Sequence, residues 1–186
     1  MRYHNITKDD MLNGDGLRVV LWVAGCSHRC KECQNPITWN PDGGLLFDDN
    51  AKKEIFEQLD EKYISGITFS GGDPLHENNL DDVLQLIEEI KFKFPNKTIW
   101  LYTGYIIKVF ETYNSDHVEI SVSPESNNNY NLLRAKIISN CNVIVDGRYE
   151  SDKRDISLHW KGSSNQRVID VQQSLKKGEI VLWGTN

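Results

Sequence analysis

The sequence predicts an α/β protein with a mostly parallel sheet and helices on its outside. Short apolar runs, which read as strands, alternate with segments of helical periodicity, and this order favours parallel strands joined by right-handed crossovers. A cysteine-rich loop and a glycine-rich loop each follow an apolar run, at the strand end where parallel sheets bind ligands. The length of 186 residues suits one core, so we expect residues 1–186 to form a single domain. The units are too few for a closed eight-stranded barrel.

The first predicted elements surround the cysteine-rich loop. Residues 1–16 read as an irregular lead-in that ends at a turn around Gly14 and Gly16, and residues 17–23 read as the first strand. A helix is expected after residues 48–50, because their acidic and amide side chains can cap it and complement its dipole.

The middle of the chain continues the alternation. Residues 66–69 form a short strand that leads into the glycine-rich loop. The clearest helix covers 80–94, where apolar residues recur at helical spacing, and Pro95 ends it. A strand over 98–102 and a helix over 105–113 follow.

The last third of the chain is less regular. Residues 117–122 alternate as a strand, an Asn-rich stretch over 123–131 reads as extra length, and a short helix is expected near 130–138. Residues 142–145 form the last well-supported core strand. The tail over 172–186 reads as a C-terminal extension.

Three of the four cysteines, Cys26, Cys30 and Cys33, follow the first strand at the spacing C-x3-C-x2-C. Thiolates are soft ligands that select zinc, copper(I) or the iron of iron–sulfur clusters. A structural zinc site and a fully ligated [4Fe–4S] cluster both need four ligands. Three thiolates on a cubane leave one iron open to a small molecule, which is a catalytic arrangement. Cys141 lies far away in an apolar stretch and receives no ligand role.

Other interpretations of the cysteine loop stay open at this point. A zinc site could take His28 as its fourth ligand, and the chain would then be a non-catalytic interaction module. A disulfide is disfavoured because nothing indicates an oxidising compartment, and Gly25 and Pro36 disfavour a buried helix face. Outside the zinc interpretation, His28 and Arg29 are expected to be exposed loop residues.

The second loop contains Gly71, Gly72 and Asp73, followed by Pro74. Glycines without a Cβ let the backbone approach a ligand closely. A lone Gly-Gly-Asp-Pro is an ordinary turn more often than a site. Its position after a strand, downstream of the cysteine loop, favours a site here.

An ordered set of motifs along the chain resembles the radical S-adenosylmethionine (SAM) enzymes. The cysteine loop is followed by Asn35, Pro36 and Trp39, as in the activases of glycyl-radical enzymes. Further matching segments are 13–18, 70–76, 100–105, 145–149 and 160–167. They resemble in particular the branch that activates the anaerobic (class III) ribonucleoside-triphosphate reductase, from Tyr3 to about Val171. Asp15, where the family usually has Pro, and the stretches 123–131 and 172–186 depart from the pattern.

The resemblance implies a curved partial (βα) barrel that holds a [4Fe–4S] cluster on Cys26, Cys30 and Cys33. SAM would bind the open iron and be cleaved, after one-electron reduction, to methionine and a 5′-deoxyadenosyl radical. That radical would generate a glycyl radical on the reductase, with electrons from a flavodoxin-like or ferredoxin-like donor. The residues expected around SAM are Glu32, Cys33, Gln34, Gly71, Gly72 and Asp73.

Other polar residues have weaker indications. Tyr102, Thr103 and Asp146 end strands, where a place beside SAM and a purely structural role fit equally well. The polar run 163–167 after Trp160 would shape the substrate face under this resemblance, and it distinguishes the reductase activases from compact radical SAM enzymes that act on small molecules. For Glu32, an exposed loop position is the competing interpretation.

Composition limits the partners. Hydrophobic residues make up 39% of the chain and charged residues 26%, as in a soluble globular protein. The formal net charge of −6 argues against general nucleic-acid binding, which needs Lys and Arg to neutralise phosphates. The apolar runs are too short for a membrane span, and the first residues lack the apolar core of a signal peptide. We therefore expect a cytoplasmic protein, where thiols stay reduced.

Overall fold

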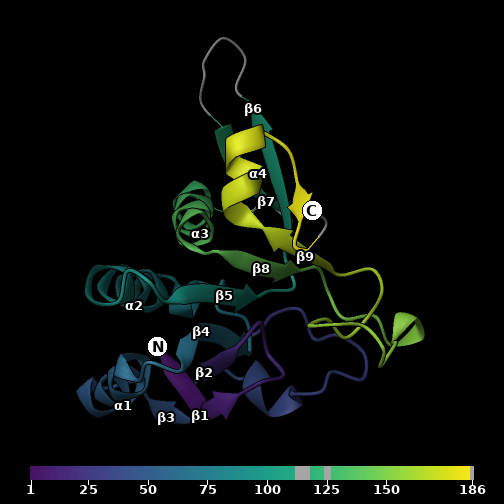
Figure 1. Cartoon of the computed structure of the whole chain (residues 1–186). Coiled ribbons are helices and arrows are strands. Elements are labelled where there is room, and N and C mark those ends of the chain that lie inside the picture. Colours follow the sequence, from purple (N-terminus) through teal and green to yellow (C-terminus); the bar gives the residue numbers. More distant parts are fainter. Residues whose placement is uncertain (112–117, 124–126, 185–186) are drawn as a thin grey trace.

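One mixed β-sheet carries most of the chain, of which the computed structural model describes residues 1–111, 118–123 and 127–184 (Figure 1). Its strands are β1 (Arg2–Asp10), β2 (Leu17–Val23), β3 (Leu45–Leu46), β4 (Ile64–Gly71), β5 (Thr98–Tyr102), β8 (Val143–Asp146), β9 (Arg167–Asp170) and β10 (Val181–Leu182). In space they follow the order β10-β9-β8-β5-β4-β2-β1-β3.

The centre of the sheet is parallel, as the sequence predicts. β2 pairs with β4, β4 with β5 and β5 with β8, all in parallel. Both faces of these strands are largely buried, and Val19, Val20 and Leu21 of β2 are fully buried. The α/β class is therefore confirmed. The flanking strands β1, β3, β9 and β10 are antiparallel, so the sheet is mixed, and within the described residues it does not close into a barrel.

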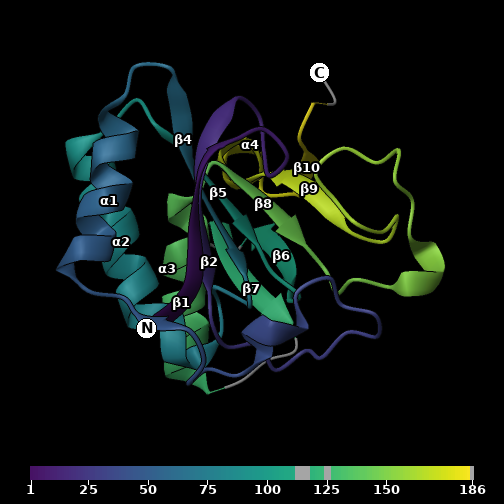
Figure 2. The same ribbon diagram turned by 90° about the horizontal axis from the view of Figure 1, so that it is seen from below.

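The longer helices cover one side of this sheet. They are α1 (Asp49–Asp60), α2 (Leu80–Lys93) and α3 (Asn128–Asn140). Figure 2 shows all three to the left of the strands, while the segments that follow β2 and β8 extend to the right. Asp48 caps α1 by accepting a hydrogen bond from the Ala51 N–H at 2.9 Å, which confirms the expected start of that helix. α2 ends just before Pro95, as predicted.

Two predicted elements are wrong. Residues 1–16 do not form an irregular lead-in, because β1 pairs along β2. Residues 106–111 are not helical: they form β6 (Ile106–Glu111), which pairs antiparallel with β7 (Val118–Ser123) in a separate two-stranded sheet. The β-branched and aromatic side chains of 106–110 favour a strand, whereas the predicted helix relied on weak periodicity. His117 and residues 112–113 lie outside the described residues.

The C-terminal part contributes more structure than the sequence suggests. β9 pairs with β8, α4 (Val171–Lys177) follows, and β10 pairs with β9, so much of the predicted extension belongs to the sheet. In the Asn-rich stretch, Asn127 caps α3, and residues 124–126 lie outside the described part. Short 3-10 turns are η1 (Pro36–Trp39), η2 (Glu77–Asn79) and η3 (Ser151–Lys153). Among the described residues, no helix has the length and apolar character to cross a membrane.

Candidate iron–sulfur and cofactor site

The cysteine loop leaves the sheet at the carboxyl end of β2. The Gly25 N–H donates to the carbonyl of Thr38 at 2.8 Å, and the Cys26 N–H donates to that of Trp39 at 3.1 Å. Gly25 has a φ of +98°, a left-handed conformation that glycine adopts without strain. The start of the loop is therefore anchored on η1, directly before its first sulfur.

Cys26 is a partly buried free thiol. Burial raises the pKa of Cys26 to about 11, and the charges of Asp73 and Cys30 act in the same direction. Hydrogen bonds from the backbone of His28 and Arg29 lower the pKa of this thiol in part. Such donors stabilise a thiolate, and they also stabilise a thiolate that is bound to iron.

The other two loop thiols have similar surroundings. Burial raises the pKa of Cys30, while a backbone hydrogen bond from Tyr149 and the charge of Arg148 oppose that shift. The thiol of Cys33 is close enough to raise the pKa of Cys30 as well. The Asn35 N–H lies 3.4 Å from the Cys33 sulfur and donates to it. Backbone groups therefore favour the thiolate form of Cys26 and Cys30, and the Cys33 sulfur accepts a backbone hydrogen bond.

This donor set fits an iron–sulfur cluster. Thiolates with backbone N–H donors at their sulfurs are the ligands that such clusters use, and these donors tune the reduction potential. In the described ranges, no three His, Cys, Asp or Glu side chains are gathered closely enough to surround a single metal ion. The fit to a cluster rests on the chemistry of the three thiolates and their backbone donors.

The glycine loop, Gly71–Leu75, lies against the start of the cysteine loop. The Gly72 N–H donates to the Val23 carbonyl at 2.8 Å, and the Asp73 N–H donates to the Gly25 carbonyl at 2.7 Å. A Cβ on Gly72 would lie 2.5 Å from that Gly25 oxygen, and one on Gly71 would lie 2.8 Å from Trp22 backbone atoms. The close contact between the two loops therefore requires glycine at positions 71 and 72. The sequence brings both predicted motifs together, as expected for neighbouring parallel strands.

The Asp73 side chain points into the protein and is 2% exposed. Its oxygens accept hydrogen bonds from four groups: His28 Nε2 at 2.8 Å, Leu75 N at 2.8 Å, Thr103 Oγ1 at 2.9 Å and Gly104 N at 3.0 Å. Burial alone would raise the pKa of Asp73, but the hydrogen bond and charge of His28 and the backbone donors outweigh burial and lower it. The carboxylate is thus ionised and fully engaged within the protein.

His28 corrects a prediction, because it is buried and not an exposed loop residue. Its ring meets the ring of Tyr105 edge-on, with 4.7 Å between centroids. The Tyr105 hydroxyl accepts a hydrogen bond at 2.9 Å from Arg134 Nη2, and Arg134 Nε donates to the Leu75 carbonyl at 2.9 Å. Arg29, the next residue after His28, is exposed as predicted.

Glu32 and Gln34 lie on the exposed outer part of the cysteine loop. Glu32 has a φ of +56°, which is uncommon for a residue with a side chain. Neither residue has a hydrogen bond or ion pair recorded in the described part of the chain, so their predicted contact with a ligand stays a prediction.

Two hollows lie in this part of the molecule, and the first has a wall from the cysteine loop. The first, which we call the Trp160 hollow, has a volume of about 480 Å³. Its walls are Leu12, Asn13, Trp22, Gln34, Tyr102, Arg154, Asp155, Ile156, Leu158, Trp160, Lys161 and Gly162. The second, the Arg167 hollow, has a volume of about 600 Å³. Its walls are Gly104, Ile106, Ser123, Asp146, Gly147, Arg148, Glu150, Asn165 and Arg167.

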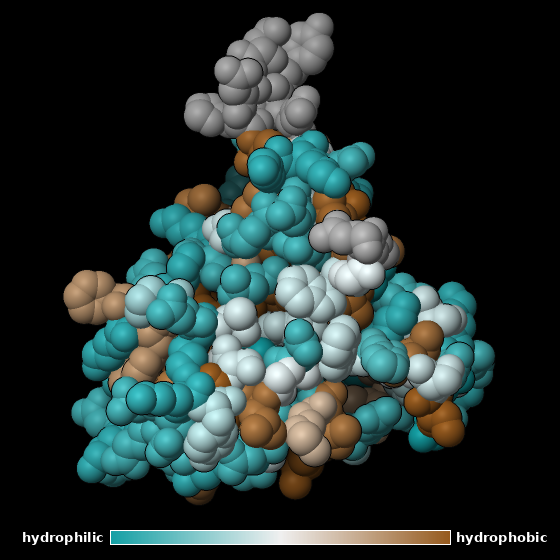
Figure 3. Space-filling view, viewed as in Figure 1, coloured by the Kyte–Doolittle hydropathy of each residue, from teal (hydrophilic) through white to brown (hydrophobic). Residues whose placement is uncertain are grey.

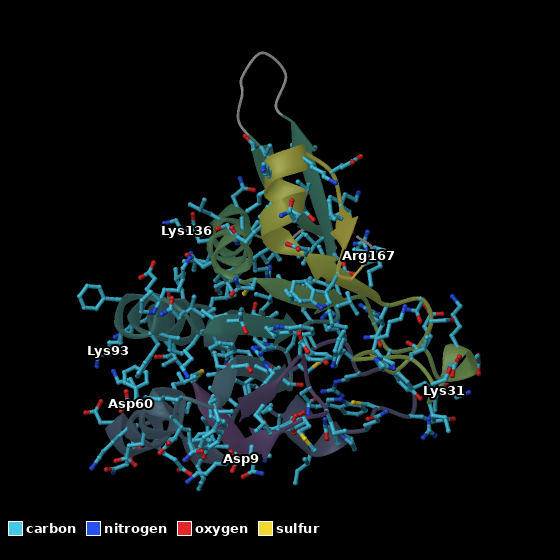
Figure 4. The ribbon with its side chains drawn as sticks, in the orientation of Figure 1. Asp9, Lys31, Asp60, Lys93, Lys136 and Arg167 are labelled. Carbon is cyan, nitrogen blue, oxygen red and sulfur yellow. The ribbon has the colours of Figure 1, made fainter. Side chains whose placement is uncertain are left out.

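The Arg167 hollow is lined by an ion pair between the buried Asp146 and the partly exposed Arg167. Arg167 Nε donates to Asp146 Oδ1 at 2.9 Å, and the Ile107 N–H donates to Asp146 Oδ2 at 2.8 Å. Figure 4 shows Arg167 on the same side of the molecule as Lys31 of the cysteine loop, away from Asp60 and Lys93 on the helices. Asp146 therefore orients Arg167 at the edge of the hollow.

The sequence did not indicate the contacts that three residues near the cysteines make. His28 contacts Asp73, while Arg148 and the backbone of Tyr149 act on Cys30. The glycine at 147 and the strand before it indicated a turn here, but nothing in the sequence said that this turn reaches Cys30. Long-range contacts of this kind come from the order of strands in the sheet.

Residues 12–169 match a protein family described as a 4Fe-4S single cluster domain. Together with the α/β fold and the three-cysteine loop, this match defines an iron–sulfur protein with one cluster domain.

Curated relatives specify the family further. A protein of Enterobacteria phage T4 is 38% identical over 168 residues, 90% of this chain and 93% of the relative. One of Escherichia coli K12 is 36% identical over 170 residues, 90% and 97% of the two chains. One of Pasteurella multocida Pm70 is 34% identical over 175 residues, 93% and 99%. All are named anaerobic ribonucleoside-triphosphate reductase-activating protein, and this chain belongs to their family.

Proposed function

We propose that this chain is a radical SAM activase that generates a glycyl radical on anaerobic ribonucleoside-triphosphate reductase. The observation that carries the proposal is the hydrogen bonding between the cysteine loop and the glycine loop, at the carboxyl ends of β2 and β4. Ligands of parallel α/β sheets bind at that end. The partner is taken from the relatives, each of which is named for activating this reductase.

Cys26, Cys30 and Cys33 would hold three irons of a [4Fe–4S] cluster and leave the fourth for SAM. When bound and reduced, this group would supply the electron for cleavage of SAM to methionine and a 5′-deoxyadenosyl radical. That radical would take hydrogen from the Cα of a reductase glycine and become 5′-deoxyadenosine. The chain itself supplies thiolates, backbone N–H donors at the sulfurs and a partly buried setting.

SAM would bind between the two loops, with Glu32 and Gln34 on one side and the backbone of Gly71 and Gly72 on the other. Both the carboxylate and the backbone of Asp73 have hydrogen-bond partners inside the protein, so Asp73 would support the glycine loop beside SAM. Gly104, whose N–H donates to Asp73, is also a wall of the Arg167 hollow. The volume of this hollow, about 600 Å³, suits a nucleoside-sized ligand.

The reductase segment that carries the target glycine would enter the Trp160 hollow. This hollow reaches the cysteine loop at Gln34, and three of its walls, Trp160, Lys161 and Gly162, directly precede the polar run 163–167 that is predicted to shape the substrate face. Leu12 and Ile156 at its border are 81% and 90% exposed. Figure 3 shows hydrophobic residues set among hydrophilic ones on this face of the molecule, mainly in its lower part. A partner protein would cover such side chains.

The proposal also covers the domain architecture, the electron donor and the cellular location. Residues 1–186 would act as one radical SAM domain, with the open sheet as a curved partial barrel. A flavodoxin-like or ferredoxin-like protein would supply electrons in the cytoplasm. The net charge of −6 supports a protein partner and neither nucleic acid nor an anionic membrane surface.

An anaerobic EPR experiment tests this function. The protein is reconstituted with iron and sulfide, reduced, and mixed with SAM and the cognate reductase. We expect a glycyl doublet on the reductase, its loss in Cys30→Ala, and its retention in the control Cys141→Ala, because Cys141 is buried away from the loop.

Two other outcomes would change the conclusion. A cluster signal that SAM alters, without a glycyl radical, would keep the cofactor chemistry and reject this partner in favour of a small-molecule substrate. A colourless protein that binds zinc and no cluster would reject both.

A further inference from the structure

The buried Asp73 carboxylate joins three separate segments of the chain. It belongs to the glycine loop, it accepts from His28 of the cysteine loop, and it accepts from Thr103 and Gly104 at the end of β5. His28 and Asp73 are 45 positions apart in the sequence, and their side chains are 4% and 2% exposed.

His28 stands midway between two cluster ligands, two positions after Cys26 and two before Cys30. The position of its ring therefore constrains the cysteine loop between these sulfurs. Asp73 follows directly after Gly72, whose backbone is expected beside SAM. The backbone bond from Asp73 to Gly25 joins the glycine loop to the start of the cysteine loop, and the His28–Asp73 bond joins it to the part between two ligands.

The surroundings are shaped around the His28 ring. A Cβ on Gly104 would lie 2.4 Å from the ring carbon Cδ2, so only glycine leaves room for it. The ring also packs edge-on against Tyr105, whose hydroxyl is held by the buried Arg134. A charge-assisted hydrogen bond in such a dry setting has well-defined geometry and is costly to break.

We propose that His28 and Asp73 form a clasp that fixes the cysteine loop, and the cluster on it, relative to the glycine loop, so that SAM meets both at once. This inference rests on the proposed cluster and SAM binding. His28 is a positioning residue in this role, since it acts through Asp73 and touches neither reactant. Asp73 likewise positions the loop, through its carboxylate.

Four variants of the reconstituted full-length protein test the clasp. His28→Leu removes the donor, and His28→Gln keeps an amide donor for Asp73. Thr103→Val removes a second donor to Asp73 at nearly constant shape. Lys31→Gln is the control, because Lys31 is an exposed residue of the same loop (Figure 4). The readouts are iron and sulfide per chain, melting of the cluster-free protein, and the SAM concentration that half-converts the EPR signal of the reduced cluster.

In His28→Leu we expect that SAM concentration to rise about 10- to 100-fold, the range expected for losing a hydrogen bond to a charged group. Thr103→Val should show a smaller rise, and His28→Gln and Lys31→Gln should stay near the wild type. If His28→Leu does not fold, Thr103→Val against Lys31→Gln decides the question.

The outcomes are separable. If the wild type responds to SAM and His28→Leu and Thr103→Val respond equally well, the clasp is overturned. The proposed function then still stands. Lower melting temperatures with unchanged SAM response also overturn it, since His28 would then be only structural. No cluster or no SAM response in the wild type overturns the clasp together with the proposed function.

Discussion

Cys141 shows what burial alone does to a thiol in this protein. It is fully buried, and its sulfur donates to the Ile137 carbonyl at 3.3 Å. Burial raises the pKa of Cys141 to about 12, with only a small opposing effect of the Lys91 charge. Within the described structure, no other cysteine shifts the pKa of Cys141, whereas Cys30 raises the pKa of Cys26. Cys141 is therefore a small apolar core residue.

The raised pKa of Cys141 predicts a loss of stability at alkaline pH. The unfolded thiol ionises near its ordinary value of 9.0, whereas the folded one keeps its proton up to about pH 12. Between these values the unfolded chain binds fewer protons, so the free energy of unfolding falls as pH rises, by at most about 1.4 kcal/mol per pH unit.

Urea unfolding of the cluster-free protein at several alkaline pH values measures this slope. Cys141→Ala should flatten the slope, although it also lowers the stability at neutral pH by leaving a small cavity. The same slope in Cys141→Ala and in the wild type would contradict the assignment.

At the residue scale, the sequence identified the reactive types but not their contacts. Cys26, Cys30 and Cys33 were recognisable from their spacing, and Gly71 and Gly72 from their place after a strand. The pairing of His28 with Asp73 was not recognisable, because no local pattern indicates which distant carboxylate a loop histidine meets. Burial of His28 depends on β5 and α3, which arrive from other parts of the chain.

At the element scale, helices with strong periodicity were predictable and weakly apolar strands were not. α2 matches its predicted range closely, since its buried residues recur at helical spacing and Pro95 ends it. β1 was missed because its residues are mostly half-buried or exposed, so alternation is faint in the sequence. Its strand conformation depends on pairing with β2 and β3.

The two faces of α2 should respond very differently to truncation. Ile87 is fully buried in the core, whereas Phe92 is 87% exposed on the same helix. Ile87→Ala should lower the free energy of unfolding by about 2–5 kcal/mol, through lost burial and a cavity. The matched variant Phe92→Ala should change it by less than about 0.5 kcal/mol. Chemical denaturation of both variants checks this, and a similar loss in both would show that α2 does not pack as described.

At the scale of the whole molecule, the parallel centre of the sheet was predictable and its antiparallel flanks were not. Long apolar strands joined through helices indicate β2, β4, β5 and β8 directly. The outer strands β3 and β10 have two residues each, which is too short for any pattern. They are strands because neighbouring backbone offers hydrogen bonds, so only the assembled sheet defines them.

Removal of the cluster should lower the thermal stability of the whole chain. A group that binds the folded chain and not the unfolded one stabilises by mass action, and the cysteine loop contacts η1, the glycine loop and the turn at Tyr149. We expect the anaerobic melting temperature to fall after chelation. The triple variant Cys26→Ser, Cys30→Ser, Cys33→Ser should melt like the chelated protein both before and after treatment. Equal melting of loaded and chelated wild type would contradict this.

The contacts of the cysteine loop also have a consequence for biosynthesis. The three cysteines leave the ribosome early, but the groups that hold them come later: Asp73, then Thr103 and Arg134, and finally Tyr149. A nascent chain shorter than about 150 residues therefore exposes three thiols without their supporting structure. Iron and sulfide should be inserted after translation, into a sheet that has already formed, and nascent chains stalled before Tyr149 should fail to retain them.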